Sequence, residues 1–348
     1  MQLKRLAIAL VAATPLFAAA QSNVQLYGVV DAAVSSQDTD GPVGRQTVVN
    51  SGNQSSSRFG FRGSEDLGNG LKAIFNLEAG TSIDTGAGDS ALFGRRAVVG
   101  LEGAFGAVTL GREYSPVASI AAASDAFGQG FYGSNLSAFS NAFPNASATT
   151  TNRLTRRLSN SINYKSAGFS GFKLLAAYGA GETAETAVLE KGDLWGIGAE
   201  YTLGGLYVGA AYQQIKRVTT DEDKESAIGA AYKFDQFGGF EIKANWMQAE
   251  RPALAKYKQA NIGGSLPFGA HRVYANFQQQ KQGSAKGNTW ALAYSYSLSK
   301  RTNLYATYAS ADNNATGQFG LTSSSVSVAA ATVGADPNVL SLGIRHSF

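Results

Sequence analysis

Hydrophobic and polar side chains alternate with a period of two along most of this chain. In residues 24–34, small or apolar residues such as Leu26 and Val30 occupy one phase, and Gln25 and Asp31 lie on the other. This alternation predicts a β-strand with one apolar face and one polar face. The same pattern predicts further strands over 57–63, 71–79, 92–101, 107–112, 157–165, 194–203, 206–212, 225–234, 240–247, 257–266, 272–280, 289–298, 303–309 and 339–348.

Two kinds of connection separate these strands in turn. Short turns fall at residues such as 204–205, 238–239 and 300–301, whereas long polar connections cover 37–54, 81–90, 181–192, 217–224, 250–255, 281–287 and 312–338. Short turns at one end and long loops at the other are typical of outer-membrane barrels, and about sixteen strands gives the even number that such barrels have. We therefore predict an all-β, sixteen-stranded antiparallel transmembrane β-barrel that forms one domain over residues 21–348.

The apolar phase is expected to face outward. A barrel this wide cannot be filled by side chains, so the polar phase must line a wet interior. A soluble sandwich or a lipocalin would also alternate, but its polar phase would be rich in Lys and Glu. Only 16% of the residues are charged, and Trp and Tyr lie near strand ends, as in interfacial girdles. The membrane barrel is therefore favoured over the soluble alternative.

The N-terminus is predicted to be a cleavable signal peptide over residues 1–20. Lys4 and Arg5 precede a short apolar run, and Ala18-Ala19-Ala20 fits an A-x-A cleavage site. Removing these two cations leaves 27 Lys and Arg (29 minus 2) against 25 Asp and Glu, a nearly neutral mature chain. This balance argues against nucleic-acid binding, which requires a dense basic face. The chain has no Cys, so an exported fold must be held by hydrogen bonds and packing.

One stretch, residues 113–152, does not alternate. It is rich in small residues and contains two charges, Glu113 and Asp125. Loops this long inside a compact domain are usually functional or disordered. We interpret it as a loop folded into the barrel that sets acidic groups opposite a basic wall. Arginines flank it on both sides: Arg95, Arg96 and Arg112 before it, and Arg153, Arg156 and Arg157 after it.

The arginines lie where charge can act on a solute. Arg58 and Arg62 share the polar phase of one predicted strand, and Arg157 heads the polar phase of another. Neighbours in a strand point to opposite faces, so either Arg95 or Arg96 is expected to face inward. Rings of charge in a pore select ions by sign. An arginine-lined pore that prefers anions is therefore predicted.

The remaining motifs give weaker evidence of function. Residues 128–133 match G-x-G-x-x-G, but no strand leads in and no helix leads out, so we interpret them as loop glycines. The two histidines, His271 and His346, without any Cys, offer no zinc site. A lipase-like triad on the outer wall, or an adhesive barrel, stays open as the alternative, although no Ser has a nucleophile setting. No enzyme activity, metal or cofactor is predicted.

The chain resembles the Gram-negative general porins, in the branch that includes anion-selective members. The likeness covers the mature chain and rests on QSNVQLYG at 21–28, SRFGFRGSEDLGNG at 57–70, FGR at 93–95, TLGR at 109–112 and GIRHSF at 343–348. It implies a trimer of sixteen-stranded barrels whose third loop narrows the pore. It also implies that residues 81–90 form a second loop that reaches a neighbouring subunit.

By this resemblance the constriction consists of Arg58, Arg95 and Arg157 against Glu78 and Asp125. Which of Arg153, Arg156 and Arg157 faces the waist stays open. Further pore-lining candidates are Arg62, Lys72, Arg96, Arg112, Glu113, Arg153 and Arg156. Phe348, an aromatic last residue on the outward phase, is a candidate assembly signal.

The predicted function is passive diffusion of small hydrophilic solutes and ions, with a preference for anions, across the outer membrane. Expected partners are two further copies of the chain, outer-membrane lipids and lipopolysaccharide, the barrel-assembly machinery, and small anions and hydrophilic solutes, but no nucleic acid.

Overall fold

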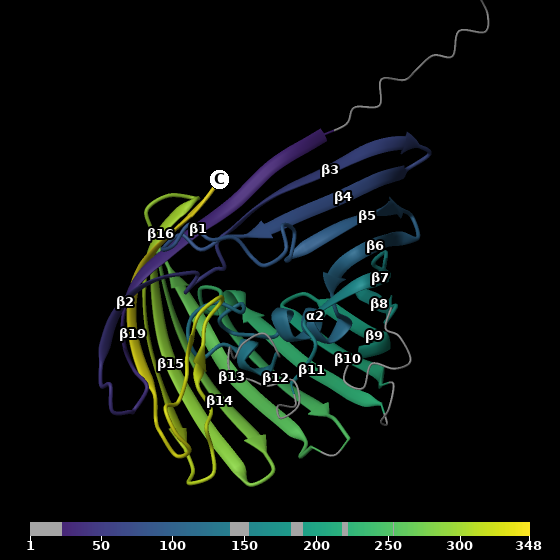
Figure 1. Ribbon diagram of the computed structural model, residues 1–348. Helices are drawn as coiled ribbons and strands as arrows, with labels where there is room; N and C mark the ends of the chain where they lie inside the picture. Colours follow the sequence, from purple (N-terminus) through teal and green to yellow (C-terminus); the bar gives the residue numbers. More distant parts are fainter. Residues whose placement is uncertain (1–22, 140–152, 182–190, 218–221, 253) are drawn as a thin grey trace, which may run out of the picture.

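A computed structural model describes residues 23–139, 153–181, 191–217, 222–252 and 254–348. The wall consists of long antiparallel strands (Figure 1). They are β1 (Asn23–Asp38), β2 (Gln46–Ser51), β3 (Arg58–Gly68), β4 (Leu71–Gly80), β5 (Arg96–Gly103), β6 (Gly106–Tyr114), β7 (Arg157–Ser166), β8 (Phe172–Gly179), β9 (Lys191–Leu203), β10 (Leu206–Arg217), β11 (Asp223–Phe234), β12 (Phe240–Glu250), β13 (Tyr257–Phe268), β14 (His271–Gln282), β15 (Ala285–Ser297), β16 (Thr302–Asn313) and β19 (Asn338–Ser347).

The remaining elements are short and lie in the connections. Helix α2 (Pro116–Ala123) and the 3-10 turn η1 (Asn135–Ala138) follow β6, and the 3-10 turn η3 (Asp235–Phe237) joins β11 to β12. The two-residue strands β17 (Leu321–Thr322) and β18 (Ser327–Val328) form a hairpin between β16 and β19. In the described part of the chain, no helix is long and apolar enough to cross a membrane.

Strand β1 closes the sheet into a barrel. One of its edges pairs with β19, and its other edge pairs first with β3 and then with β2. Because β2 and β3 lie end to end along β1, the 17 strands that the described residues place in the sheet occupy sixteen positions. Beyond β19, the backbone N–H of Phe348 donates to the carbonyl of Gly28 at 3.1 Å, and the reciprocal bond has the same length. The predicted barrel, closed between its first and last strands, is confirmed.

The prediction that the apolar phase faces outward is also confirmed. Ile197 and Ile228 leave 56% and 58% of their surface exposed, whereas Gln213 and Gln259, on the opposite phase, are fully buried. A closed barrel with an apolar outer surface satisfies all backbone groups within the wall, which is the requirement for a membrane-spanning sheet.

Several predicted boundaries were wrong. Residues 92–95 form a turn rather than the start of a strand, and β5 begins at Arg96. The expected polar connections over 37–54 and 281–287 contain β2 and the ends of β14 and β15. Strand β8 was not predicted as a range because Leu175 and Ala177, on its inner phase, are apolar and hide the alternation. Leu175 is apolar because it joins the hydrophobic cluster that includes Val117 of α2.

Residues 115–139, which follow β6, pack inside the barrel (Figure 1). Helix α2 contacts the inner face of β8 to β11, and Val117, Ile120 and Ala121 are fully buried there. Ser115 caps the helix by accepting the N–H of Ala118 at 3.1 Å, and Pro116 occupies its first turn. Farther along, the side chain of Asn276 on β14 donates to the carbonyl of Gly133 at 2.7 Å. The loop is therefore fixed to the wall from β8 to β14.

Candidate pore constriction

Glu78, on β4, is the centre of a compact charge cluster. One carboxylate oxygen lies 2.7 Å from Nε of Arg95, and the other lies 3.4 Å from Nε of Arg58. The Tyr27 hydroxyl also donates to Glu78, at 3.0 Å. Alternation in β3 and β4 puts Arg58 and Glu78 on the inner face. Arg95 belongs to the turn before β5, where its backbone N–H donates to the Glu78 carbonyl at 3.3 Å.

Two further arginines approach from the end of the inward loop. A guanidinium N–H of Arg157 donates to the Tyr114 hydroxyl at 2.9 Å, and the Arg157 guanidinium carbon lies 4.7 Å from the centre of the Tyr114 ring. Arg156 lies 5.7 Å from the same ring centre and donates to the side-chain carbonyl of Gln129 at 2.9 Å. Tyr114, at the end of β6, therefore holds both guanidinium groups in place.

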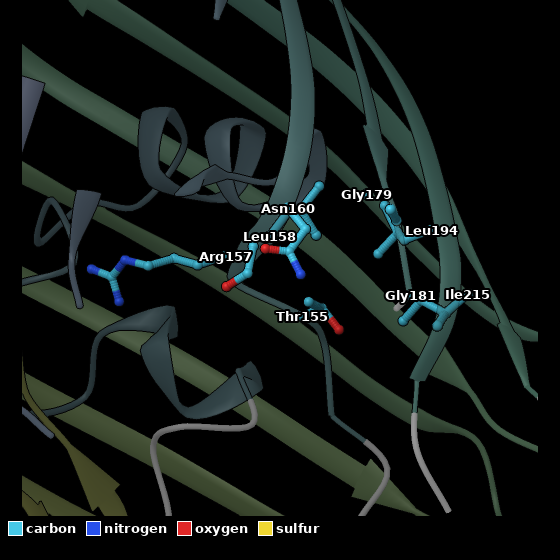
Figure 2. A pocket seen from close by; sticks show the side chains of 10 residues that line it. Thr155, Arg157, Leu158, Asn160, Gly179, Gly181, Leu194 and Ile215 are labelled. Atoms are coloured by element: carbon cyan, nitrogen blue, oxygen red, sulfur yellow. The ribbon is translucent and has the colours of Figure 1, made fainter. Parts of the chain in front are cut away.

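The position of these arginines follows from the anchoring of Thr155. The backbone N–H and the hydroxyl of Thr155 donate to the carboxylate of Glu225 on β11 at 2.7 and 2.9 Å. Figure 2 shows the result: Thr155, Leu158, Leu194 and Ile215 line a pocket in the wall, whereas the side chain of Arg157 extends away from them. The Arg157 guanidinium is thus carried toward the interior of the barrel.

Arg156 and Arg157 have little compensation for their charge. Within the described residues neither forms an ion pair, and the Nε atoms of both are buried without a hydrogen-bond acceptor. Burial and the neighbouring Arg157 charge lower the pKa of Arg156 below its usual range. Buried charges are normally paired. The charge of this pair of guanidinium groups is therefore largely uncompensated by the described residues.

The structure places both Arg95 and Arg96 against inner-face carboxylates, so the prediction that only one would face inward was wrong. Arg95 precedes the strand, where strict alternation does not apply. Nε of Arg96 donates to Glu113 at 2.8 Å. Arg112 shares the phase of the outward residue Leu110, and donates to the Gly94 carbonyl at 2.6 Å and to Ser159 at 2.7 Å.

The other candidates lie apart from the cluster. Arg62 donates two N–H groups to Gln25, at 2.9 and 2.8 Å, farther along β3 toward its short turn. Lys72 is exposed near the same turn. Arg153 stacks 4.0 Å over the Tyr257 ring and donates to Gln282 on β14, so it belongs to the side of the barrel against which the loop packs.

Asp125 does not face the arginines, which corrects the prediction made from the sequence. Its side chain is fully buried within the loop. Its two oxygens accept the backbone N–H groups of Gln129, at 2.7 Å, and Asn135, at 3.0 Å. Burial raises the pKa of Asp125 to about 6. Its carboxylate therefore stabilises the loop conformation and adds no charge to the pore lining.

The loop glycines of the G-x-G-x-x-G match contribute to this winding. Gly128, Gln129, Phe131 and Gly133 all have positive φ angles, of 61°, 59°, 44° and 88°. No strand and helix flank the motif as a dinucleotide site requires.

The histidines do not support a hydrolase triad. Nδ1 of His271 lies 2.6 Å from the Tyr294 hydroxyl, and its ring stacks among aromatic residues at the short-turn end of the barrel. Nδ1 of His346 lies 2.8 Å from the Thr302 hydroxyl. Among the residues with described positions, neither histidine has a Ser or an acidic partner.

A closed antiparallel barrel with an apolar exterior, a polar interior and a loop packed inside defines an outer-membrane channel protein. The family model of the Gram-negative porins matches residues 7–316, and the chain belongs to this family. It is an outer membrane porin, located in the outer membrane, and a passive channel rather than an enzyme.

Individual relatives agree with this placement. The chain is 30% identical to outer membrane porin protein 32 of Delftia acidovorans, over 95% of each chain. It is 29% identical to an outer membrane porin protein of Bordetella pertussis, over 86% of this chain and 92% of the relative. Among solved structures it is similar to an anion-selective porin from Comamonas acidovorans, with a TM-score of 0.80 and 27% identity over 94% of this chain and all of the other.

Proposed function

We propose that this porin passes small hydrophilic solutes by diffusion and prefers anions at a constriction formed by Arg58, Arg95, Arg156 and Arg157 with Glu78. The observation that carries the proposal is the imbalance of charge: Arg58 and Arg95 share the single carboxylate of Glu78, whereas Arg156 and Arg157 contact Tyr114 and no carboxylate among the described residues. The loop covers the inner face from β8 to β14, so the path for solutes runs between the loop and the wall that holds Glu78.

The magnitude of the effect is sufficient for selectivity. One uncompensated unit charge about 8 Å from an ion, at an effective dielectric constant near 20, changes the ion's free energy by about 2 kcal/mol before screening. At physiological salt the Debye length is about 8 Å, so charges at the constriction act and those on outer loops contribute little. A nearly neutral chain can therefore prefer anions strongly. The name of the similar Comamonas structure, an anion-selective porin, supports this reading.

The experiment is the reversal potential of the purified porin in planar bilayers across a potassium chloride gradient. We expect stepwise channels that prefer chloride, more strongly at low salt. Replacing both Arg58 and Arg157 with Gln should remove most of this preference. Arg301→Gln, a loss of the same charge at an exposed short turn, is the control. A cation-selective wild type, or an unchanged reversal potential in the double variant, would refute the constriction; an adhesin or enzyme would form no steady channels.

We also propose that the protein acts as a homotrimer that engages membrane lipids, lipopolysaccharide and the barrel-assembly machinery. The outward phase of β1 contains Ala32, a small residue that allows a second barrel to approach closely. A solved structure with 17% identity, the Vibrio cholerae outer membrane protein OmpT, is described as a trimer form, and its TM-score of 0.67 supports a shared fold.

A further inference from the structure

A second segment folds into the barrel between β2 and β3. Residues 52–57 are held there by Asp31 on β1, which is almost fully buried. The Asp31 carboxylate accepts the N–H groups of Asn53 at 3.1 Å and Ser55 at 2.9 Å, and the hydroxyl of Tyr305 at 2.6 Å. The carbonyl of Asp31 accepts the N–H of Gly52 at 2.9 Å. We refer to residues 52–57 as the bracket.

The bracket is also tied to the hairpin of β17 and β18. The N–H of Ser56 donates to the hydroxyl of Ser324 at 2.6 Å, and the hydroxyl of Ser56 donates to the carbonyl of Ser324 at 2.9 Å. The N–H of Ser325 donates to the carbonyl of Gly52 at 2.9 Å. Because it is attached both to Asp31 and to the hairpin, the bracket can hold the side chains that contact it in fixed positions.

The bracket contacts one arginine from the strand on each side of β1. Nη1 of Arg58, on β3, donates to the carbonyl of Ser56 at 2.8 Å. Nε of Arg345, on β19, donates to the hydroxyl of Ser55 at 2.8 Å. Strand β1 lies between β3 and β19 in the sheet, so the two side chains start on different strands and converge on adjacent residues. Arg345 was not predicted as a site residue from the sequence.

The outer edge of the Arg345 guanidinium is free. Among the described residues, its side chain forms one hydrogen bond, from Nε, and no ion pair. Asp31 faces Arg345 in the strand register, but its oxygens are engaged by the bracket and Tyr305. Two parallel guanidinium N–H groups match the two oxygens of a carboxylate or phosphate, whereas chloride offers a single acceptor atom.

We propose that Arg345 and Arg58, positioned by the bracket, form an oxyanion-binding site in the pore that takes carboxylate or phosphate groups. The site rests on the proposed function and deepens it. It makes the channel distinguish one anion from another, in addition to preferring anions over cations. Arg58 contributes charge that it shares with the constriction, and Arg345 contributes the bidentate edge. An oxyanion held there should hinder the passage of chloride while it stays bound.

The test is the chloride current of single channels at fixed ionic strength as inorganic phosphate is added. In the wild type we expect a saturable decrease in current. Arg345→Gln should raise the half-blocking phosphate concentration about tenfold or more, because it removes both the positive charge and the paired N–H donors. Arg345→Lys keeps the charge without the planar edge. It should retain the chloride reversal potential and lose most of the phosphate effect. Arg301→Gln should behave as the wild type.

Each outcome bears on the site separately from the constriction. Phosphate blocking that is absent in the wild type, or equal in the wild type and both Arg345 variants, would overturn the site. If the double Arg58 and Arg157 variant then still lost chloride preference, the constriction would stand. If Arg345→Gln failed to insert, Arg345→Lys would decide, since equal blocking in that variant would exclude a bidentate role.

Discussion

Replacing Glu78 with Gln should increase the anion preference of this porin. Glu78 is the carboxylate shared by Arg58 and Arg95, and Gln has nearly the same shape. The substitution can keep the hydrogen bond from Tyr27 while it removes one negative charge. The basic groups should stay in place, because Arg58 also donates to the Ser56 carbonyl and the turn at Arg95 is held by its backbone N–H.

The expected change follows from Coulomb's law with screening. A unit charge about 8 Å from the ion contributes about 2 kcal/mol at an effective dielectric constant near 20, and one Debye length reduces this to roughly 0.8 kcal/mol. The anion gains this amount and the cation loses it. The ratio of chloride to potassium permeability should therefore rise about tenfold, since about 1.4 kcal/mol corresponds to a factor of ten.

The assay is the reversal potential across a tenfold potassium chloride gradient, with single-channel conductance recorded in parallel. Glu65→Gln, the same substitution at an exposed position near the short turn after β3, is the matched control and should have little effect. An unchanged or weaker anion preference in Glu78→Gln, at normal conductance, would show that Glu78 does not offset the arginines in the path of the ions.

Three further predictions concern other parts of the barrel. Asp125→Asn should leave the reversal potential unchanged and lower the free energy of unfolding by about 1–3 kcal/mol, because Asn accepts only one of the two N–H groups that Asp125 binds. A changed ion selectivity in this variant would contradict the buried position of Asp125. Gly28→Ala should reduce the yield of heat-modifiable folded barrel on gels, because its Cβ would clash with the ring of Phe348. Adding Phe348→Ala to Gly28→Ala should cause little loss beyond that of Phe348→Ala alone, whereas additive losses would exclude the clash. Light scattering of mild detergent extracts should give the mass of a trimer, and a monomer alone would refute that proposal.

The wall of the barrel could be predicted from the sequence because alternation is a local property. Each strand buries its polar face and exposes its apolar face to lipid, so the pattern survives in nearly every segment. It fails at Leu175 and Ala177, where the inner phase packs against other hydrophobic groups instead of water. Leu175 packs against helix α2, and Ala177 packs with Leu158, Leu194 and Ile215 of neighbouring strands. Periodicity within one strand cannot reveal such contacts.

The constriction could be predicted only in part, because its residues lie where strands end. Arg95 and Arg156 stand outside β5 and β7, and their directions are set by a turn and by the anchoring of Thr155 on Glu225. The composition of the loop suggested an acidic group facing the arginines. The left-handed winding around Gln129 instead turns backbone N–H groups toward Asp125, which a charge count does not show.

The excess of positive charge in a nearly neutral chain has a structural cause. Three acidic groups inside the barrel are engaged as hydrogen-bond acceptors that hold inward segments in place. Asp31 binds the bracket, Asp125 binds the loop backbone, and Glu225 binds Thr155. Because these carboxylates are directed toward N–H and hydroxyl donors, Arg156 and Arg157 have no ion-pair partner among the described residues. The folding of the loop and the anion preference proposed here therefore depend on the same arrangement: the acids fix the inward segments, and the cations remain for the solute.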